Sequence, residues 1–291
     1  MIHLVAASLL WAFSFGLIKG QLAGIDPVAV ACGRLLLATV AFLPLLVRRR
    51  PSRRAAWAAM ALGTVQFGLM YMLYIASYRW LPAWMVAVFT IFTPLYVILI
   101  AGLREKRLGK RHILAAMLAV LGAGVVVARG LPVGADWRGV VLLQGANLCF
   151  AAGQVYYLRL RQATGLPEAT LLGWMYLGAA LATLTAVLVG WVAGGEPLAG
   201  WHRSAVGVLV YLGLVPTAVG FYLWNRGSVR VRAGTLAAAN NLKVPLAVLV
   251  SWLIFGEQAP YGQVLAGLAL ILAGLFVATT RGNGIPAVGR R

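Results

Sequence analysis

Long apolar runs separated by short polar or basic segments dominate this sequence. A helix that crosses about 30 Å of hydrocarbon needs about 20 consecutive apolar residues. With clusters of Arg, Lys, Pro and Gly taken as boundaries, such runs lie near residues 3–21, 27–47, 55–78, 82–103, 111–129, 138–158, 169–193, 204–225, 233–255 and 260–280. The pattern therefore predicts an all-α integral membrane protein with ten transmembrane helices.

The composition agrees with this prediction and argues against a soluble globule. Of the 291 residues, 62% are hydrophobic and 11% are charged, and a globule of this size cannot bury so much apolar surface. The net charge of +19 does not indicate a nucleic-acid partner, because the basic residues form short clusters between apolar runs. Cys32, Cys149 and the histidines are scattered without ligand spacing, so we expect no metal site and no cofactor.

The basic residues also test the helix count and predict the orientation. Most of the 25 Lys and Arg residues fall in the second, fourth, sixth and eighth connections or after the tenth helix. By the positive-inside rule, both termini are then cytoplasmic, in a multi-pass protein of the cytoplasmic (inner) membrane. Aromatic belts mark membrane interfaces, and the predicted outer ends carry Trp80, Trp137, Trp191 and Trp201.

Two parts of the chain share a pattern at a separation of about 150 residues. TPLYVILIAGL resembles VPLAVLVSWLI, with Pro94 aligned on Pro245 and, further along, Gly124 on Gly274. Five helices per repeat is an odd number, so the second copy enters the membrane inverted, and inverted repeats place a binding site at their interface near the midplane. The alternative is a chance likeness between segments rich in Leu, Ala and Gly.

Three further features carry a resemblance to a known family. They are LLWAFSFGLIKG in the first span, the Arg of ACGRLL in the second, and a helix with a central Pro followed by Glu and a Gly-rich helix, which occurs twice. Together they resemble the drug/metabolite transporter (DMT) superfamily of EamA type. The resemblance implies two inverted five-helix EamA-like repeats at 1–130 and 138–281, an outer linker at 131–137 and a short basic cytoplasmic tail at 282–291.

Members of this superfamily export amino acids, amines, sugars and other metabolites, and the aromatic amino acid exporters are one branch. The resemblance implies a secondary transporter, exporter or facilitator, that moves a small metabolite such as an amino acid or an aromatic or amphipathic solute by alternating access. The alternative is a proton-coupled multidrug or amine exporter of the same superfamily. The expected partners are a small-molecule substrate and membrane lipids, with no nucleic acid, in a monomer or weak homodimer.

Other functional classes find less support in the residues. An intramembrane enzyme needs a nucleophile with a base, or a metal cluster, on facing helices. The sequence contains no HExxH, no GxSxG and no paired carboxylates inside a span, so we expect no enzymatic activity. A selective ion channel would need charged rings along its spans, and a scaffold would show no solute flux.

Lys243 and Arg34 are the basic residues inside predicted spans, where ionisable groups are costly and functional by default. Lys243 lies near the middle of the ninth helix, on one face with Asn240, and is either an anchor for a substrate carboxylate or a structural strut. Arg34 is interpreted as a structural charge that snorkels outward or pairs with an acid such as Asp26. All 6 acids lie at predicted helix ends or in connections, which argues against proton coupling through a carboxylate and leaves Lys243 as the alternative proton carrier.

Polar and aromatic stripes on several predicted helices would line one cavity. Amides there would bind polar groups and aromatic rings would form the walls, although the same residues could serve as interhelical contacts and packing. The predicted substrate-binding residues are Trp11, Gln66, Tyr74, Tyr78, Thr90, Gln144, Asn147, Gln154, Phe221, Trp224, Asn240, Asn241 and Lys243.

Prolines and glycines suggest where helices bend and where they pack closely. A proline removes a backbone hydrogen bond and bends its helix, so Pro94 and Pro245 are predicted hinges. Small residues permit close helix contact, and in the fifth and tenth helices they could form a dimer surface. These residues are Gly122, Gly124, Gly267 and Gly274.

Overall fold

A computed structural model describes residues 2–48, 50–104, 110–126, 134–228, 233–258 and 260–279. The described chain is helical and contains no strands. In order, its elements are α1 (Ile2–Gln21), α2 (Pro27–Arg48), α3 (Arg53–Gly63), η1 (Thr64–Leu69), α4 (Met70–Ser77), α5 (Ala83–Phe89), η2 (Thr90–Phe92), α6 (Thr93–Arg104), α7 (Lys110–Val126), α8 (Trp137–Thr164), α9 (Glu168–Val192), α10 (Arg203–Leu212), η3 (Gly213–Val219), α11 (Gly220–Ser228), α12 (Ala233–Leu253) and α13 (Tyr261–Thr279).

The elements join into rods that correspond to the ten predicted spans. Three rods are composite, because α3–η1–α4, α5–η2–α6 and α10–η3–α11 are each consecutive along the chain, with a π or 3₁₀ turn between two α-helices. By length and composition, 7 rods could cross a membrane, and the other rods carry shorter apolar stretches at Ile113–Val126, Leu242–Leu253 and Tyr261–Gly274. The predicted tail at 282–291 and part of the linker at 131–137 lie outside the described residues.

Rod ends agree with the predictions to within a few residues, except at α8. This helix extends beyond the predicted end at residue 158 to Thr164. Arg159 and Arg161 do not end it, because basic side chains are compatible with a helix that leaves the hydrocarbon. It ends where Gly165 adopts a left-handed conformation with φ of 62°, which glycine reaches without strain.

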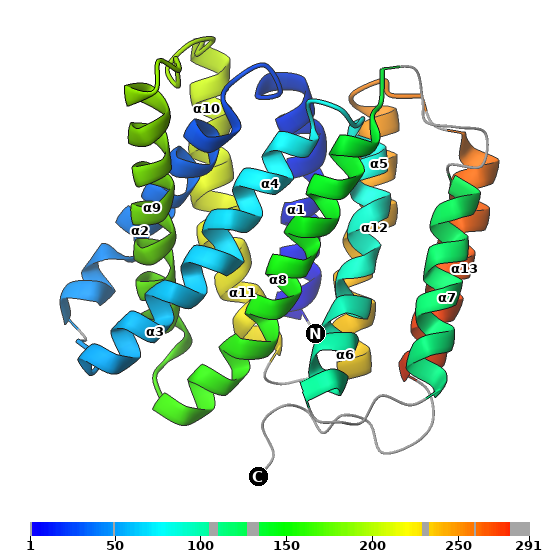
Figure 1. Cartoon of the computed structure of the whole chain (residues 1–291), viewed down its shortest axis with the longest axis horizontal. Coiled ribbons are helices and arrows are strands. Elements are labelled where there is room, and N and C mark those ends of the chain that lie inside the picture. Colours follow the sequence, from blue (N-terminus) through cyan, green and yellow to red (C-terminus); the bar gives the residue numbers. More distant parts are fainter. Residues whose placement is uncertain are drawn as a thin grey trace.

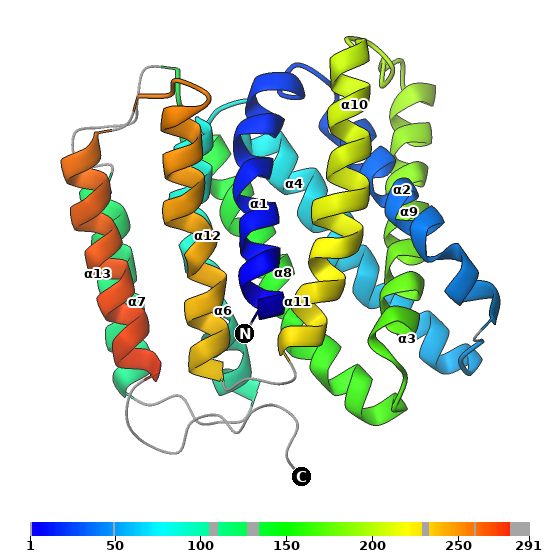
Figure 2. The same cartoon turned by 180° about the vertical axis from the view of Figure 1, so that it is seen from behind.

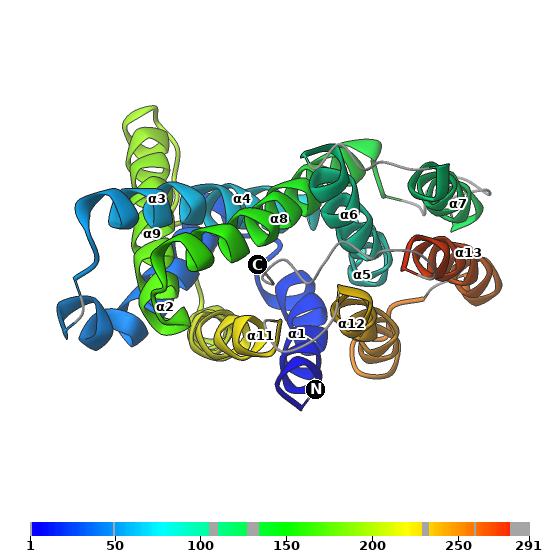
Figure 3. The ribbon, with the colours of Figure 1, turned by 90° about the horizontal axis from the view of Figure 1, so that it is seen from below.

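The two halves run in opposite directions and exchange their first helices. In Figure 1, α1 and α8 cross the bundle in opposite senses along the chain. Helix α1 lies between α11 and α12 of the second half (Figure 2), and α8 packs on α4 and α6 of the first. Seen along the rods, α11, α1 and α12 form one row and α4, α8 and α6 form the facing row (Figure 3). The helices α1 and α8 therefore occupy the centre.

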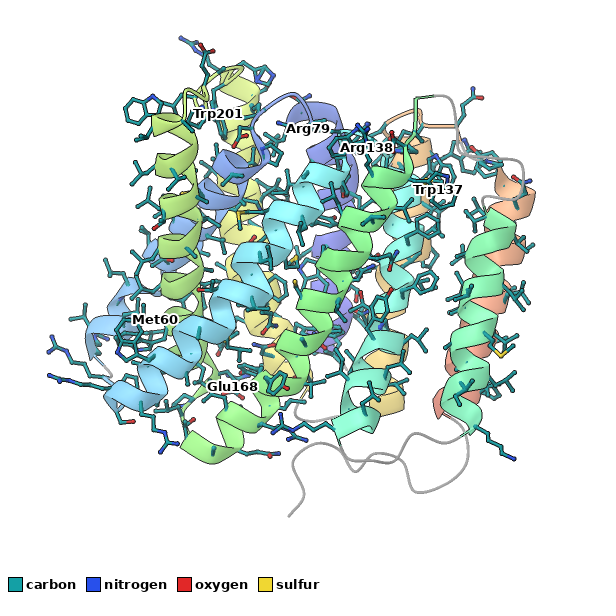
Figure 4. All side chains as sticks on the ribbon, viewed as in Figure 1. Met60, Arg79, Trp137, Arg138, Glu168 and Trp201 are labelled. Atoms are coloured by element: carbon teal, nitrogen blue, oxygen red, sulfur yellow. The ribbon has the colours of Figure 1, made fainter. Side chains whose placement is uncertain are left out.

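Charged and aromatic residues distinguish the two ends of the bundle. Arg79, Trp137, Arg138 and Trp201 lie toward one end, and Glu168 lies toward the other (Figure 4). The end with Glu168 also carries Arg48, Arg53, Arg104 and Arg161 at helix termini, and we call it the basic end. An ion pair of 2.7 Å between Arg161 Nη2 and Glu168 Oε1 joins α8 to α9 there.

Corresponding rods of the two halves each contain a π-helical turn. These turns are η1, between α3 and α4, and η3, between α10 and α11. A π turn inserts an extra residue into a helix and occurs often at functional sites. In both rods, the residues just beyond the turn, on α4 and α11, face the centre of the bundle.

Glycines allow several rods to approach to backbone contact. A Cβ atom at Gly63 would overlap the carbonyl of Met175 on α9, and one at Gly178 would overlap the carbonyl of Met60 on α3. This is the small-residue packing that membrane helices use. It fixes the α3–η1–α4 rod against α9.

The glycines of α7 and α13 pack these two helices of the same chain against each other. A Cβ atom on Gly122 would lie 2.6 Å from the carbonyl oxygen of Gly267, and one on Gly274 would lie 2.8 Å from that of Ala115. Gly124 has no atom within 4 Å of the corresponding position. The predicted close contact therefore joins α7 to α13, and the homodimer stays a prediction.

Substituting Gly63 by Ala tests the α3–α9 contact. The added methyl has no room, and overpacking costs about 1–3 kcal/mol, so we expect G63A to lower the free energy of unfolding in detergent by that amount. Gly207 on α10 is the matched control, because nothing lies within 4 Å of its added Cβ. There, alanine raises helix propensity and should leave stability unchanged or higher. Equal stability of both variants would contradict the contact.

Candidate functional site

A cavity of about 80 Å³ lies between the two rows of helices. It is bordered by α1, α2, α4, η2, α6, α8, α11 and α12, so both halves contribute. Its lining consists of Trp11, Ser14, Phe15, Arg34, Met70, Tyr71, Tyr74, Thr90, Thr93, Ala146, Asn147, Phe150, Phe221 and Lys243. Among these residues two are cationic and none is acidic. The cavity is thus aromatic and positively charged.

Lys243 reaches the cavity from α12 and is 8% exposed. Its Nζ donates a hydrogen bond of 3.2 Å to Asn240 Oδ1. The ammonium also lies 5.1 Å from the ring centroid of Trp11 and 5.8 Å from that of Phe150, and aromatic faces attract cations. An ammonium has three donors, so Lys243 can still donate to a ligand.

Arg34 reaches the cavity from α2 of the first half and is 2% exposed. Its guanidinium lies 4.2 Å above the ring of Tyr71, and Nη2 donates to the Tyr71 hydroxyl at 3.2 Å and to Thr217 Oγ1 at 3.0 Å. Nη1 is buried and has no partner among the described residues. Arg34 therefore presents a free donor on the cavity wall.

Arg34 does not pair with Asp26, which was one of the two alternatives for this residue. Asp26 Oδ1 instead accepts hydrogen bonds from the backbone N–H groups of Val28 and Ala29, at 3.0 and 2.9 Å, and so caps the start of α2. Arg34 lies two turns further along this helix and bonds to η3 and α4. The carboxylate of Asp26 is satisfied by the backbone at the start of α2, and the guanidinium of Arg34 by side chains of η3 and α4.

Side chains from three helices hold the π turn η3. Trp11 Nε1 donates to the carbonyl of Pro216 at 2.9 Å, and the Tyr176 hydroxyl donates to the carbonyl of Thr217 at 2.8 Å. Thr217 Oγ1 accepts from Arg34 and itself donates to the carbonyl of Leu212 at 2.7 Å. In lipid, backbone groups freed by an irregular turn need such partners. The turn is thus fixed mainly by the first half and α9.

The rod α5–η2–α6 is interrupted directly in front of Pro94 by the 3₁₀ turn η2. Asn147 on α8 satisfies this interruption, because its Nδ2 donates to the carbonyl of Phe89 at 2.9 Å and its Oδ1 accepts from Thr93 Oγ1 at 3.2 Å. Pro245, by contrast, lies inside the unbroken α12. The two predicted hinges therefore differ in local structure.

The structure gathers part of the predicted binding set at the cavity. Residues that line it are Trp11, Tyr74, Thr90, Asn147, Phe221 and Lys243. Three more contact the lining: Asn240 accepts from Lys243, the hydroxyls of Tyr78 and Tyr74 share a hydrogen bond of 2.7 Å, and Gln144 Oε1 accepts from Asn147 at 3.2 Å.

The remaining predicted residues lie elsewhere. Gln154 and Trp224 border a second, smaller pocket toward the basic end. Gln66 packs against Gly153 and lines neither pocket, because it falls within η1, whose extra residue rotates it away from the face of Tyr74. The side chain of Asn241 lies outside the described part of the chain.

Sequence reasoning missed Tyr71 and Thr217. Tyr71 shares a helical stripe with Tyr74 and Tyr78, at i, i+3 and i+7, and this stripe could have revealed it. Thr217 lies inside a π turn that no periodicity indicated. Its role therefore emerges only from the structure.

Asn147 is predicted to stabilise the interrupted rod. Asn147→Ala leaves the buried carbonyl of Phe89 without a donor, and such an unpaired group costs about 1–3 kcal/mol. We expect the free energy of unfolding in detergent to fall by that amount. Gln162, an exposed amide near the end of the same helix, is the control, and Gln162→Ala should change stability little. No difference between the variants would refute this role.

The fold and the site define a multi-pass membrane protein with a cavity between two related, oppositely oriented halves. The profile of the EamA-like transporter family matches the chain twice, over residues 1–128 and 137–280. The chain therefore belongs to this family, within the drug/metabolite transporter superfamily, and has its ten-helix membrane fold. Its general function is transport.

Relatives with names cover nearly the whole chain. A protein of Pseudomonas aeruginosa named "Probable biotin transporter" is 39% identical over 283 residues, 95% of this chain and 96% of the relative. The "Biotin transporter" of Escherichia coli (strain K12) is 36% identical over 279 residues, 95% and 92% of the two chains.

A more distant relative and a solved structure extend the comparison. The "Probable terminal-alkyne amino-acid exporter" of Streptantibioticus cattleyicolor is 27% identical over 290 residues, 97% of this chain and 93% of the relative. A solved structure titled "Crystal structure of protein" superposes with a TM-score of 0.65 at 21% identity and covers 96% of both chains. The latter likeness concerns the fold alone.

Proposed function

We propose that this protein carries a small organic carboxylate, with biotin as the leading candidate, across the membrane by alternating access of its two halves. The observation that carries this proposal is the charge of the central cavity. Its described lining holds Arg34 and Lys243 and no acid. A solute that carries one negative charge and an uncharged polar group would complement this lining.

The other lining residues fit the remainder of such a solute. Trp11, Phe150 and Phe221 offer apolar ring faces, which suit an aliphatic chain and a thioether ring. Asn147 Oδ1 and Thr93 Oγ1 keep lone pairs that can accept hydrogen bonds from the N–H groups of a ureido group. Biotin combines these parts, and the two most similar relatives described above are named for its transport.

An amino acid is the second candidate, because a more distant relative is named as an amino-acid exporter. An amino acid at neutral pH carries an ammonium group beside its carboxylate. Within the described lining, no carboxylate is available to pair with that ammonium, and Arg34 and Lys243 would repel it. The cavity therefore favours a monoanion over a zwitterion.

The described cavity is too small to hold a whole solute of this kind. Ligand pockets for small molecules commonly measure about 300–1,000 Å³, and the cavity of about 80 Å³ is much smaller. The two halves must therefore move apart at one end to admit the solute. Such motion about a central site is the behaviour of inverted-repeat carriers.

We also propose the orientation that the basic residues indicate, with the basic end and both termini on the cytoplasmic side. The acids of the described chain lie at helix ends, for example Asp136, Glu168 and Glu257. Without an acid in the described lining, a carrier that works as a facilitator is the simpler mechanism. Proton-coupled export through Lys243 is the alternative.

Replacing Lys243 by Gln tests the anion site. We expect counterflow of labelled biotin in proteoliposomes to fall at least tenfold, because losing one charged hydrogen-bond partner costs about 1.5–3 kcal/mol. Lys110 at the exposed start of α7 is the matched control, and Lys110→Gln should transport normally. Unchanged counterflow in Lys243→Gln would exclude this lysine from the site.

A panel of solutes separates the candidate functions. In wild-type proteoliposomes, biotin should exchange and should compete with other monocarboxylates, whereas phenylalanine should compete weakly. Exchange should be independent of an imposed pH gradient. Stronger counterflow with phenylalanine would favour the amino-acid function, and exchange driven by the gradient would favour proton coupling.

A further inference from the structure

We infer that the central cavity binds a small monovalent inorganic anion, such as chloride, at Lys243 when it holds no solute. The inorganic ion and the carboxylate of the solute then compete for the same ammonium. The binding of the ion follows from the described cavity alone, whereas the competition rests on the proposed transport function. The inference deepens that function, because it identifies what neutralises the site between one solute and the next.

The ammonium of Lys243 has hydrogen-bond donors to spare. Its Nζ donates to Asn240 Oδ1 at 3.2 Å and has no other hydrogen-bond partner among the described residues. An ammonium carries three donors. Since the side chain lines the cavity and is 8% exposed, the remaining donors find their acceptors in the cavity itself.

The charge of the cavity calls for an anion as well as for water. Water accepts hydrogen bonds from an ammonium but leaves its charge in place. Arg34 lines the same cavity, a guanidinium keeps its charge in proteins, and the described lining contains no acid. The ring centroids of Trp11 and Phe150 lie 5.1 and 5.8 Å from Nζ, and opposite charges attract more strongly in such surroundings than in bulk water. An anion at Nζ is therefore stabilised by both cations.

The volume of the cavity suits an inorganic ion. A water molecule needs about 10–15 Å³ of such space, and the cavity offers about 80 Å³. A halide ion with several waters therefore fits, whereas a whole solute does not. The ion can bind in the described conformation, and the halves must move apart before the solute replaces it.

Asn240→Asp tests the site by supplying an anion from within the chain. Asn240 is 4% exposed, its Oδ1 accepts from Lys243, and its Nδ2 has no hydrogen-bond partner among the described residues. Replacing this nitrogen by oxygen keeps the size of the side chain and removes no described hydrogen bond. The new carboxylate pairs with the ammonium and repels a second anion, so we expect the affinity for chloride to fall by about tenfold or more.

Gln162→Glu is the matched control, because it makes the same change of charge at an exposed position of α8. The measurement is equilibrium binding of radiolabelled chloride to the purified protein in detergent. The net charge of +19 attracts counterions to the whole surface, and the control separates these from the cavity. We expect wild type and Gln162→Glu to bind chloride saturably and alike. Equal affinity in the two variants, or no saturable binding by wild type, overturns the site.

Thermal unfolding gives a second readout of the ion site. A ligand that binds the native state raises the melting temperature, and general effects of salt act on all variants alike. Chloride should therefore raise the melting temperature of wild type more than that of Asn240→Asp. Lys243→Gln removes the cation and should behave like Asn240→Asp, so the test stands if one of the two variants fails to fold. The same response to chloride in wild type and variants contradicts the site.

Transport kinetics test the competition. In wild-type proteoliposomes with equal chloride on both sides, chloride should raise the KM for biotin counterflow and leave the maximal rate unchanged. In Asn240→Asp the KM should be higher and independent of chloride. A wild-type KM that does not change with chloride, in protein that binds the ion, overturns the shared site. Absence of biotin transport counts against the proposed function, and chloride binding then judges the ion site alone.

Discussion

The rest of the structure depends on two positive charges inside the membrane bundle, beside which the described part of the chain places no acid. Charged groups at membrane depth are costly and need partners. Arg34 comes from the first half and Lys243 from the second, and each is surrounded by ring faces, hydroxyls or an amide. These neutral partners lower the cost and leave the charges unneutralised. The cavity between them is thus suited to an anion.

The irregular turns of the helices follow from the same arrangement. The π turn η3 is held by Trp11 from the opposite half, and the interruption before Pro94 is held by Asn147, again from the opposite half. Each half therefore satisfies backbone groups that the other half exposes. Because Trp11 and Asn147 also line the cavity, any relative motion of the halves acts directly on the residues around the solute.

The apolar runs sufficed to predict the rods, because membrane thickness fixes the length of a spanning helix. They also placed Lys243 and Asn147 at the centre, since a polar residue in mid-span must face other helices. Of the two alternatives for Arg34, the pair with Asp26 is not formed. The partners of Arg34 are Tyr71 and Thr217. Thr217 lies in a π turn, and the periodicity of a regular helix carries no signal for such a turn.

The sequence did not predict which way some residues face on their helices, or which helices contact each other. Gln66 was predicted to bind substrate together with Tyr74, but it lies in the π turn η1 and packs against Gly153. Pro94 and Pro245 occupy equivalent places in the sequence, yet a 3₁₀ turn adjoins the first alone. Gly122 and Gly267 would permit close contact with any helix. In the structure they lie against each other, between α7 and α13.

The central claim is that the cations of the cavity hold the carboxylate of the solute. Equilibrium binding of biotin and of its uncharged primary amide, to wild type and to Lys243→Gln in detergent, tests it most directly. The account predicts that wild type prefers biotin over the amide at least tenfold, about 1.4 kcal/mol, and that the variant loses most of this preference. Equal discrimination by both proteins would contradict the account.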